Sequence, residues 1–181
     1  MSLDGVVESP EKWSFPYWNE EIGKFKFEET FASGALLLGR VTYEGFAAVL
    51  PGRKDPEGFA DRFNGMPKHV ASRTLKKLEW NNSHLLRGEL AAEVSKLKQQ
   101  SGRDIVVHGS PGLIGSLMPH DLIDEYRLLV YPLVLGRGKR LFNEKSQTSL
   151  KLVGSKAFAT VVVKLIYRLR GKAKPAAASA Q

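Results

Sequence analysis

The sequence predicts an α/β protein, with a mixed, mainly parallel sheet between helical layers and a C-terminal antiparallel hairpin at the edge of that sheet. Two observations support this fold class. Short apolar runs alternate with helical patterns between residues 35 and 135, as strands and helices alternate in parallel sheets. Closer to the C-terminus, two strand-like segments follow each other directly, and apolar side chains alternate from Val161 to Leu169, which is typical of a hairpin.

Each predicted element rests on a local pattern. Residues 35–38 are all apolar, as in a strand that is covered on both faces. Residues 89–100 have the pattern of an amphipathic helix, with apolar residues on one face. Further strands are expected at 68–71, 85–86, 104–108, 126–135, 150–155 and 160–169, and further helices at 42–50, 59–63 and 110–118.

Length and composition limit the class of protein. The 181 residues fit one domain, which we place at 1–170, followed by a low-complexity tail at 171–181 that we expect to be disordered. The absence of cysteine excludes disulfide bonds and thiolate metal sites. No apolar run is long enough to span a bilayer, and the N-terminus lacks the features of a signal peptide, so we expect a cytoplasmic protein without a membrane partner.

The net charge of +8 favours anionic ligands. The lysines and arginines are scattered, however, and no arginine-rich helix is present, so a solvated surface is favoured over nucleic-acid binding. A polyphosphate cofactor fits the charge equally well. The four histidines show no metal-ligand spacing, and we predict no metal site.

Three segments share one pattern, in which a buried strand ends and small or hydroxylated residues lead into a helix or turn. Ligands of open α/β sheets collect at the carboxyl ends of the strands, where the N–H groups of helix starts accept phosphates. In the first segment, Gly39 lets the backbone approach a ligand, Arg40 supplies a cation, and Thr42 is a candidate N-cap. An ordinary capped turn with a surface arginine explains this segment equally well.

In the second segment, Ser72, Arg73 and Thr74 follow a strand. A guanidinium that forks onto two oxygens, flanked by two hydroxyl groups, suits a phosphate monoester such as the one that distinguishes NADPH from NADH. Taken alone the signal is weak, because Ser-Arg-Thr is common in loops.

The third segment is His-Gly-Ser-Pro-Gly-Leu-Ile at 108–114. Ser110 as N-cap and Pro111 at the first helical position signal a helix start, and Gly109 and Gly112 clear space for a pyrophosphate. The segment is not the Gly-x-Gly-x-x-Gly fingerprint, which argues against a conventional Rossmann site. Purely structural capping by Ser110 and Pro111 stays open as an alternative.

Four aromatic residues gather near the N-terminus, namely Trp13, Phe15, Tyr17 and Trp18. They could wall a flat, ring-shaped substrate, although a packing cluster beneath a loop is the default explanation. The sequence therefore offers Trp13 and Tyr17 as candidate substrate contacts, with packing as the alternative.

Four segments, taken in order, resemble one known family. They are Ser-Leu-Asp-Gly-Val-Val-Glu at 2–8, Leu-Gly-Arg-Val-Thr-Tyr-Glu at 38–44, His-Gly-Ser-Pro-Gly-Leu at 108–113 and Val-Leu-Gly-Arg-Gly-Lys-Arg-Leu-Phe at 134–142. Up to about residue 170, the chain is similar to the reductase (C-terminal) domain of the bifunctional riboflavin-biosynthesis deaminase-reductase, and most of all to stand-alone bacterial relatives of that domain. The wider family is similar in fold to dihydrofolate reductase.

The resemblance implies a dihydrofolate-reductase-like, three-layer α-β-α fold with NADPH across the strand ends, and a homodimer. The residues that it would place at the cofactor are Gly39, Arg40, Thr42, Ser72, Arg73, Thr74, Gly109, Ser110, Gly112, Leu113 and Ile114. Asp4, Trp13 and Glu21 would fall on the substrate side, where Asp4 or Glu21 would orient the substrate or relay a proton. A surface or capping carboxylate is the alternative, and is favoured for Glu21.

Two departures from the family matter. The zinc-binding His/Cys motif of the deaminase half is missing, so we do not expect the bifunctional enzyme. The family's first strand lies ahead of Ser-Leu-Asp-Gly, whereas this chain starts one residue before that motif. We therefore expect an inner strand to be lacking, which would leave an adhesive sheet edge and cause poor solubility or strand exchange.

The residues and the resemblance together predict an NADPH-dependent reductase that transfers hydride to a small heterocyclic or carbonyl/imine substrate, similar to 5-amino-6-(5-phosphoribosylamino)uracil reductase. The alternative is a protein of the same fold that binds NADPH without turnover, as a sensor. A basic nucleic-acid-binding module is the weakest hypothesis, and we expect a small-molecule partner instead.

Overall fold

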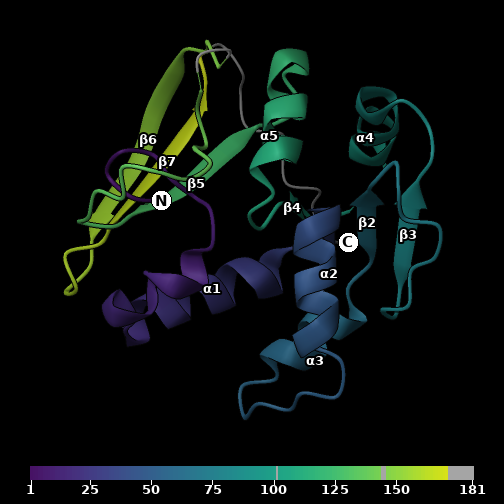
Figure 1. Cartoon of the computed structure of the whole chain (residues 1–181), viewed down its shortest axis with the longest axis horizontal. Helices are drawn as coiled ribbons and strands as arrows, with labels where there is room; N and C mark the ends of the chain where they lie inside the picture. Colours follow the sequence, from purple (N-terminus) through teal and green to yellow (C-terminus); the bar gives the residue numbers. More distant parts are fainter. Residues whose placement is uncertain (101, 144–145, 171–181) are drawn as a thin grey trace, which may run out of the picture. The chain divides into compact units, whose positions relative to one another are not determined.

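The computed structural model describes residues 1–100, 102–143 and 146–170 (Figure 1). The chain divides into two compact units, one made by residues 1–25 and 114–170 and the other by residues 26–113. The tail predicted at 171–181 lies outside the described residues, and the single domain over 1–170 stays a prediction. Of the helices described, none is both long and apolar enough to cross a membrane.

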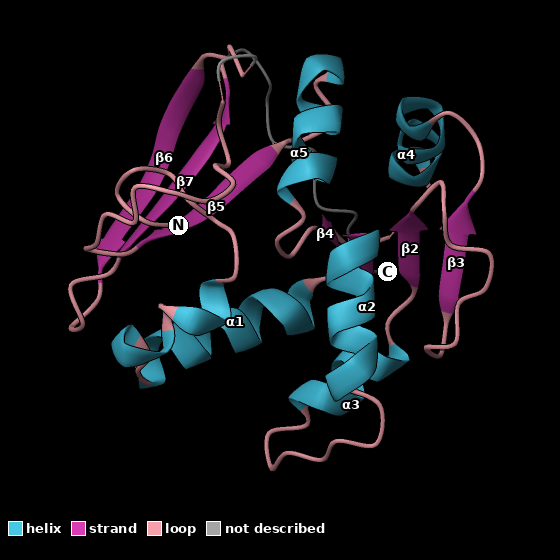
Figure 2. Ribbon diagram, in the orientation of Figure 1, coloured by secondary structure: helices cyan, strands magenta, loops and turns pink. Residues whose placement is uncertain are grey.

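The unit of residues 26–113 is built on a parallel sheet (Figure 2). Its strands are β1 (Ala35–Gly39), β2 (Lys68–Ala71), β3 (Ser83–Leu86) and β4 (Ile105–Val106), in the order β3-β2-β1-β4. The connection from β1 to β2 holds α2 (Arg40–Val49) and α3 (Phe59–Gly65), and that from β3 to β4 holds α4 (Leu90–Gln99). In this order, the connection from β1 to β2 crosses the sheet in one direction and the connection from β3 to β4 crosses it in the opposite direction. Right-handed crossovers therefore place α2 and α4 on opposite faces of the sheet.

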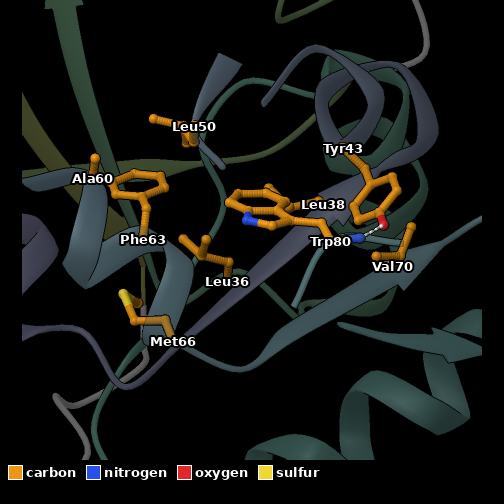
Figure 3. Close-up of a cluster of buried hydrophobic side chains, with 9 residues drawn as sticks. All are labelled: Leu36, Leu38, Tyr43, Leu50, Ala60, Phe63, Met66, Val70 and Trp80. Atoms are coloured by element: carbon orange, nitrogen blue, oxygen red, sulfur yellow. Dashed lines mark hydrogen bonds between the residues drawn. The ribbon is translucent and has the colours of Figure 1, made fainter. Parts of the chain in front are cut away.

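The apolar core of this unit covers one face of the sheet, where α2 and α3 pack (Figure 3). Alternate strand residues Leu36, Leu38 and Val70 belong to it, as the two-residue period of strands requires. Trp80 lies in the same cluster, and its backbone N–H donates to Tyr43 Oη at 3.0 Å. The buried tyrosine hydroxyl thus ties the connection between β2 and β3 to α2.

Lys68, the first residue of β2, is completely buried. Its ammonium donates to three backbone carbonyls, those of Asn64 at 2.8 Å, Met66 at 2.7 Å and Asn81 at 2.9 Å. It also lies 4.4 Å from the centre of the Trp80 ring. Burial lowers the pKa of Lys68 to about 8. The carbonyls replace water around the ammonium, and they join the two chain segments that enter β2 and β3.

The unit of residues 1–25 and 114–170 is built on an antiparallel sheet in the order β5-β7-β6. Its strands are β5 (Glu125–Val130), β6 (Leu150–Ala157) and β7 (Val163–Leu169), with an irregularity in β6 between Leu152 and Gly154. The buried members of its core are Ile22, Tyr131, Phe158 and Val162.

The N-terminus adds backbone hydrogen bonds beside this sheet. Tyr131 N–H donates to Met1 O and Leu3 N–H donates to Leu133 O, each at 2.8 Å. Residues 131–133 continue from the end of β5, so the first residues of the chain pair with that continuation. The inner strand that we expect to be lacking concerns residues ahead of Met1, and its absence stays a prediction.

Helix α1 (Glu20–Ala32) and the short 3-10 helices η1 (Pro10–Lys12) and η2 (Phe15–Tyr17) have no counterpart among the predicted elements. The apolar residues of α1 form two stripes. Ile22 and Phe25 lie on one side of the helix, while Phe27 and Phe31, whose ring centres are 4.1 Å apart, lie on the other. The single apolar stripe on which a helix prediction depends is therefore missing.

The α/β class and the C-terminal hairpin are confirmed. The described strands nevertheless form two separate sheets, whereas the sequence predicts one mixed sheet. The strand predicted at 104–108 shortens to β4, and the one at 126–135 ends at Val130, shortly before Pro132, which has no N–H for a ladder. Where a helix is predicted at 110–118, the structure has α5 (Pro111–Leu117), followed directly by the short 3-10 helix η3 (Met118–His120).

We expect the burial of a valine to determine how much its replacement by alanine lowers the free energy of unfolding. Val70→Ala removes two methyl groups from a fully buried position and should lower the free energy of unfolding by about 2 kcal/mol. The matched change Val49→Ala, at a residue of α2 that is 56% exposed, should stay within about 0.5 kcal/mol of the unchanged protein. Urea unfolding measures both, and equal losses at the two positions would contradict the assigned core.

Candidate functional site

The three segments that the sequence singles out leave one edge of the parallel sheet. Gly39 ends β1 and is paired in register with Ala71, the last residue of β2, so residues 39–42 and 72–74 leave the sheet from neighbouring strand ends. Residues 109–114 follow β4, which pairs with β1 on its other side. Because the strands are parallel, the segments meet at the carboxyl edge.

A serine hydroxyl joins the first and third segments. Ser110 Oγ accepts a hydrogen bond from Gly39 N–H at 3.0 Å and donates one to Thr42 Oγ1 at 2.7 Å. We call Gly39, Thr42 and Ser110 the hydroxyl clamp. Ser110 is buried, so these bonds are shielded from water. A Cβ at Gly39 would approach Ser110 Oγ to 3.1 Å, which is why this close approach falls at a glycine.

The clamp holds an uncommon backbone conformation. Gly109 and Ser110 both have positive φ, of 68° and 60°. Glycine adopts this left-handed region freely, but a serine there carries a cost of roughly 1–2 kcal/mol. The two hydrogen bonds of the Ser110 hydroxyl offset that cost, and they keep the turn after β4 in this shape.

Helix α2 begins earlier than predicted, which corrects the role expected of Thr42. The N-cap position belongs to Gly39 and Arg40 is the first helical residue, so Thr42 lies inside the first turn. The Thr42 hydroxyl accepts the bond from Ser110 instead of capping the helix. Pro111 is the first residue of α5, as predicted.

Arg40 forms an ion pair with Glu44 one turn further along α2, with 2.9 Å between Nη1 and Oε2. Both side chains are nearly half exposed, and a surface pair of this kind contributes only about 0.3–0.5 kcal/mol. A phosphate near the helix start would compete well with Glu44 for the guanidinium. Arg40 is therefore still a candidate for anion binding.

In the second segment, Ser72 shapes a turn from which Arg73 extends. Ser72 Oγ accepts hydrogen bonds from Thr74 N–H at 3.2 Å and from Leu75 N–H at 3.0 Å. Arg73 is exposed, and it forms no hydrogen bond or ion pair with any described residue. Its guanidinium is therefore available to an anion at the strand end.

The remaining residues of the third segment lie in α5. Gly112 is exposed, Leu113 is buried and Ile114 is half-buried. A Cβ at Gly39 would lie 3.8 Å from Leu113 Cβ, so Leu113 packs close to the end of β1. Leu113 thus supports the hydroxyl clamp from the buried side.

The Asp4 carboxylate is engaged within its own unit. It accepts hydrogen bonds from Ser2 Oγ at 2.6 Å, from Gly136 N–H at 2.9 Å and from Leu135 N–H at 3.1 Å. The hydrogen bond from Ser2, followed by that from Leu135, lowers the pKa of Asp4 to about 2. Arg140 Nη2 lies 3.4 Å away. A carboxylate that is ionised at neutral pH and held by these donors is suited to fix the loop that follows β5.

Glu21 is held in a similar way. It accepts hydrogen bonds from Lys156 Nζ and from Ala159 N–H, both at 2.9 Å. The backbone bond from Ala159, followed by the bond from Lys156, lowers the pKa of Glu21. These contacts fasten the start of α1 to β6 and to the turn after it, which supports the alternative of a structural carboxylate at the surface for Glu21 and shows no helix cap.

Trp13 and Tyr17 pack edge-on against Tyr131, with ring centres 5.4 Å and 5.9 Å away. The Trp13 indole N–H donates to a backbone carbonyl, Glu8 O, at 2.9 Å. These contacts support the packing cluster over a substrate wall for both residues. Phe15, from the same stretch, is instead 65% exposed.

A cluster of charged residues and a histidine beside the clamp is not predicted by the sequence. His108, which precedes Gly109, packs on Phe63 with ring centres 5.6 Å apart, and its Nδ1 lies 3.2 Å from Lys26 Nζ. Lys26 also forms an ion pair with the buried Glu29. Burial, followed by the Lys26 charge, holds the pKa of His108 well below its ordinary value, so the imidazole is neutral. The cluster anchors the chain that enters the clamp, and only the position of His108 next to Gly109 points to it in the sequence.

We expect the left-handed conformation to reverse the usual order of two substitutions at Ser110. Ser110→Ala removes both hydroxyl bonds and keeps a Cβ at positive φ, so it should lower the free energy of unfolding by about 1–3 kcal/mol. Ser110→Gly loses the same bonds but relieves the backbone, and should be less destabilising than Ser110→Ala by about 1 kcal/mol. Urea unfolding measures both, and a better tolerated alanine would contradict the assigned conformation.

Asp4 should contribute stability that depends on acid pH. Because its pKa is lowered from 3.8 to about 2, this contribution is complete above about pH 4 and is lost as the pH falls through 2. Asp4→Asn should therefore lower the melting temperature at pH 7 and change it little at pH 2. Thermal unfolding at both pH values measures this, with the exposed Glu11→Gln as control. The same loss at both pH values would exclude the proposed linkage.

Comparison with known sequences places the chain in a family. Residues 1–164 match the RibD C-terminal domain family. The uncharacterized protein YyaP of Bacillus subtilis (strain 168) is 32% identical over 140 residues, which cover 75% of this chain and 74% of YyaP. The uncharacterized protein YwjB of the same strain is 29% identical over 169 residues, which cover 90% of each chain.

Solved structures have the same fold. A protein from Shewanella sp. PV-4 that is named for riboflavin biosynthesis has a TM-score of 0.73 at 21% identity, over 94% of this chain and 95% of its own. A pyrimidine reductase-like protein from Corynebacterium diphtheriae has a TM-score of 0.64 at 11% identity, over 93% of this chain and 88% of its own. The predicted fold class and the resemblance read from the sequence are both confirmed: the chain belongs to the RibD C-terminal domain family, a reductase family.

Proposed function

We propose that this protein is an NADPH-dependent reductase that transfers hydride to a small heterocyclic or carbonyl/imine substrate. The proposal rests on membership of a reductase family and on one geometric observation. Three segments rich in glycine, hydroxyl and guanidinium groups meet at the carboxyl edge of a parallel sheet, which is where open α/β sheets bind nucleotides.

The residues at this edge suit a dinucleotide. A Cβ at Gly109 would have only Thr42 Oγ1, at 3.8 Å, within 4 Å, so the backbone there is open to a close ligand. The unpaired guanidinium of Arg73 adds a cation at a neighbouring strand end, and the net charge of +8 attracts a polyphosphate. Backbone and charge at this edge therefore fit the pyrophosphate and the adenosine phosphate of NADPH.

NADPH supplies a hydride when it is bound. The residues of the protein bind the cofactor and orient it. The first and third segments would hold the pyrophosphate and the nicotinamide side, while Ser72, Arg73 and Thr74 would hold the adenosine 2′-phosphate. Ser110 keeps the first and third segments together, so that both can contact one ligand in a fixed geometry.

Asp4 and Glu21 remain the proposed carboxylates on the substrate side, and their contacts limit what they can do. Both accept several hydrogen bonds and have lowered pKa values, so both are ionised at neutral pH. We therefore propose that they hold the loops around the substrate and do not donate protons. Trp13 and Tyr17 support this region through their packing on Tyr131.

The proposed substrate class draws on the family and on one structural neighbour. The name of the Corynebacterium protein, pyrimidine reductase-like, supports a flat nitrogen heterocycle such as 5-amino-6-(5-phosphoribosylamino)uracil. A cytoplasmic homodimer with small-molecule ligands, and without a nucleic-acid or membrane partner, stays a prediction.

A second candidate function uses the same edge without turnover. The engagement of both Asp4 and Glu21 favours it, because neither carboxylate is placed to supply a proton. Incubation with NADPH and a panel of pterins, flavins and aminouracils distinguishes the two functions. Oxidation of NADPH by one of these compounds supports the reductase, and saturable binding without oxidation by any of them supports a sensor.

Nucleotide binding is the first test. Titration of NADPH against the tryptophan fluorescence should give saturable binding, with weaker binding of NADH, which lacks the 2′-phosphate. Arg73→Gln should raise the dissociation constant of NADPH roughly tenfold and change that of NADH by less than about twofold. Arg53→Gln is the matched control. Arg53 follows the end of α2, in the connection that leads to the start of β2, so it lies away from the carboxyl ends of the strands. If neither nucleotide binds, the proposal is refuted.

A further inference from the structure

A cluster of titratable side chains lies beside the hydroxyl clamp and has no role in the proposed function. Lys26 Nζ is 3.2 Å from His108 Nδ1 and forms an ion pair with Glu29, whose Oε2 lies 4.0 Å from the same ring nitrogen. An ammonium can only donate, so Nδ1 accepts and the neutral imidazole carries its proton on Nε2. His108 and Glu29 therefore hold the Lys26 ammonium in a fixed place, next to the turn that begins at Gly109.

The proposed reaction needs a proton as well as a hydride. Hydride addition to a C=N or C=O group leaves an electron pair on the nitrogen or oxygen, which must take up a proton. Asp4 and Glu21 do not supply it, because hydrogen bonds lower the pKa of both carboxyl groups and keep them ionised at neutral pH. A protein acid for this step has to come from elsewhere in the chain.

Lys26 is the member of the cluster that suits this role. The Glu29 side chain is only 5% exposed, and His108 Nε2 is buried without a hydrogen-bond partner among the described residues, so neither presents a proton to a ligand. The Lys26 side chain is 25% exposed, so its ammonium can contact a ligand and exchange protons with water. The guanidinium of Arg40, the first residue after β1, keeps its protons in proteins and cannot act as the acid.

We propose that Lys26 contacts the substrate as the catalytic acid of the reduction. The inference rests on the proposed function and names the residue that donates the proton. The hydride adds to the carbon of the C=N or C=O group, and the π electrons of that bond move to the nitrogen or oxygen. This atom forms a bond to a proton as an N–H bond of Lys26 breaks. The cofactor leaves oxidised, the substrate leaves reduced, and the neutral amine of Lys26 recovers a proton from water.

Substitution of the lysine separates its proton from its charge. Lys26→Ala should lower the single-turnover rate of NADPH oxidation roughly hundredfold or more and change the dissociation constant of NADPH by less than about threefold. Lys26→Arg keeps a positive charge beside Glu29 but holds its protons, so it should be slowed to a similar degree. Lys24→Ala, at an exposed lysine of the same helix, is the matched control and should change neither quantity.

The rate is measured with the pterin, flavin or aminouracil that the unchanged protein reduces, and the dissociation constant by tryptophan fluorescence. Small amines give a further test, because they can enter the space that the side chain leaves in Lys26→Ala. Methylammonium and ethylammonium should raise the rate of this variant about tenfold, whereas tetramethylammonium, which has a charge but no N–H, should not raise it. Circular dichroism melts check that each variant is folded, and Lys26→Arg decides if Lys26→Ala is not.

The assignment of Lys26 would be overturned, with the reductase left standing, by an unchanged rate in Lys26→Ala, by rapid turnover in Lys26→Arg, or by restoration of the rate with tetramethylammonium. A dissociation constant of NADPH that rises as strongly as the rate falls would also overturn it, because the lysine would then hold the phosphates of the cofactor. If the unchanged protein oxidises NADPH with no compound of the panel, both proposals are overturned.

Discussion

The hydrogen bond from Gly39 N–H to Ser110 Oγ, continued to Thr42, is the contact on which the candidate site depends. It joins the end of β1 to the turn after β4, and these two segments carry every group proposed for the pyrophosphate. It also opposes the relaxation of Ser110 from positive φ, since the cost of that conformation is comparable with one or two net hydrogen bonds. The neutral His108, packed on Phe63, holds the same turn from the other end.

The described charged groups differ in whether they have partners. The carboxylates of Asp4 and Glu21 accept several hydrogen bonds each and hold loops in place, whereas the guanidinium group of Arg73 has no described partner. The net charge of +8 favours anions in general, and the unpaired Arg73 adds a local attraction at its strand end. Screening by physiological salt limits this attraction to about 8–10 Å, so it selects among ligands that already reach the strand ends.

How much could be predicted depended on whether a feature is local. Strand β2 has the bounds that its short run of residues predicts, and α5 begins at the predicted Pro111. Helix α1 was not predicted, because its apolar residues form two stripes and lack the single stripe of an amphipathic helix. Thr42 was misplaced as an N-cap because β1 passes into α2 without a loop, and no local pattern shows that the strand ends at Gly39.

By itself, the sequence determined the α/β class, the three segments that follow strand ends and the family resemblance, because hydrophobic period and the signals of glycine, proline and serine act over a few residues. Only the tertiary structure decided that the Ser110 hydroxyl bonds to the end of β1 and that the Asp4 carboxylate is held by the loop after β5. These features join residues far apart in the chain, 71 positions for Gly39 and Ser110 and 131 for Asp4 and Leu135. Strand register and packing of the whole chain set such contacts, and no short window of sequence contains them.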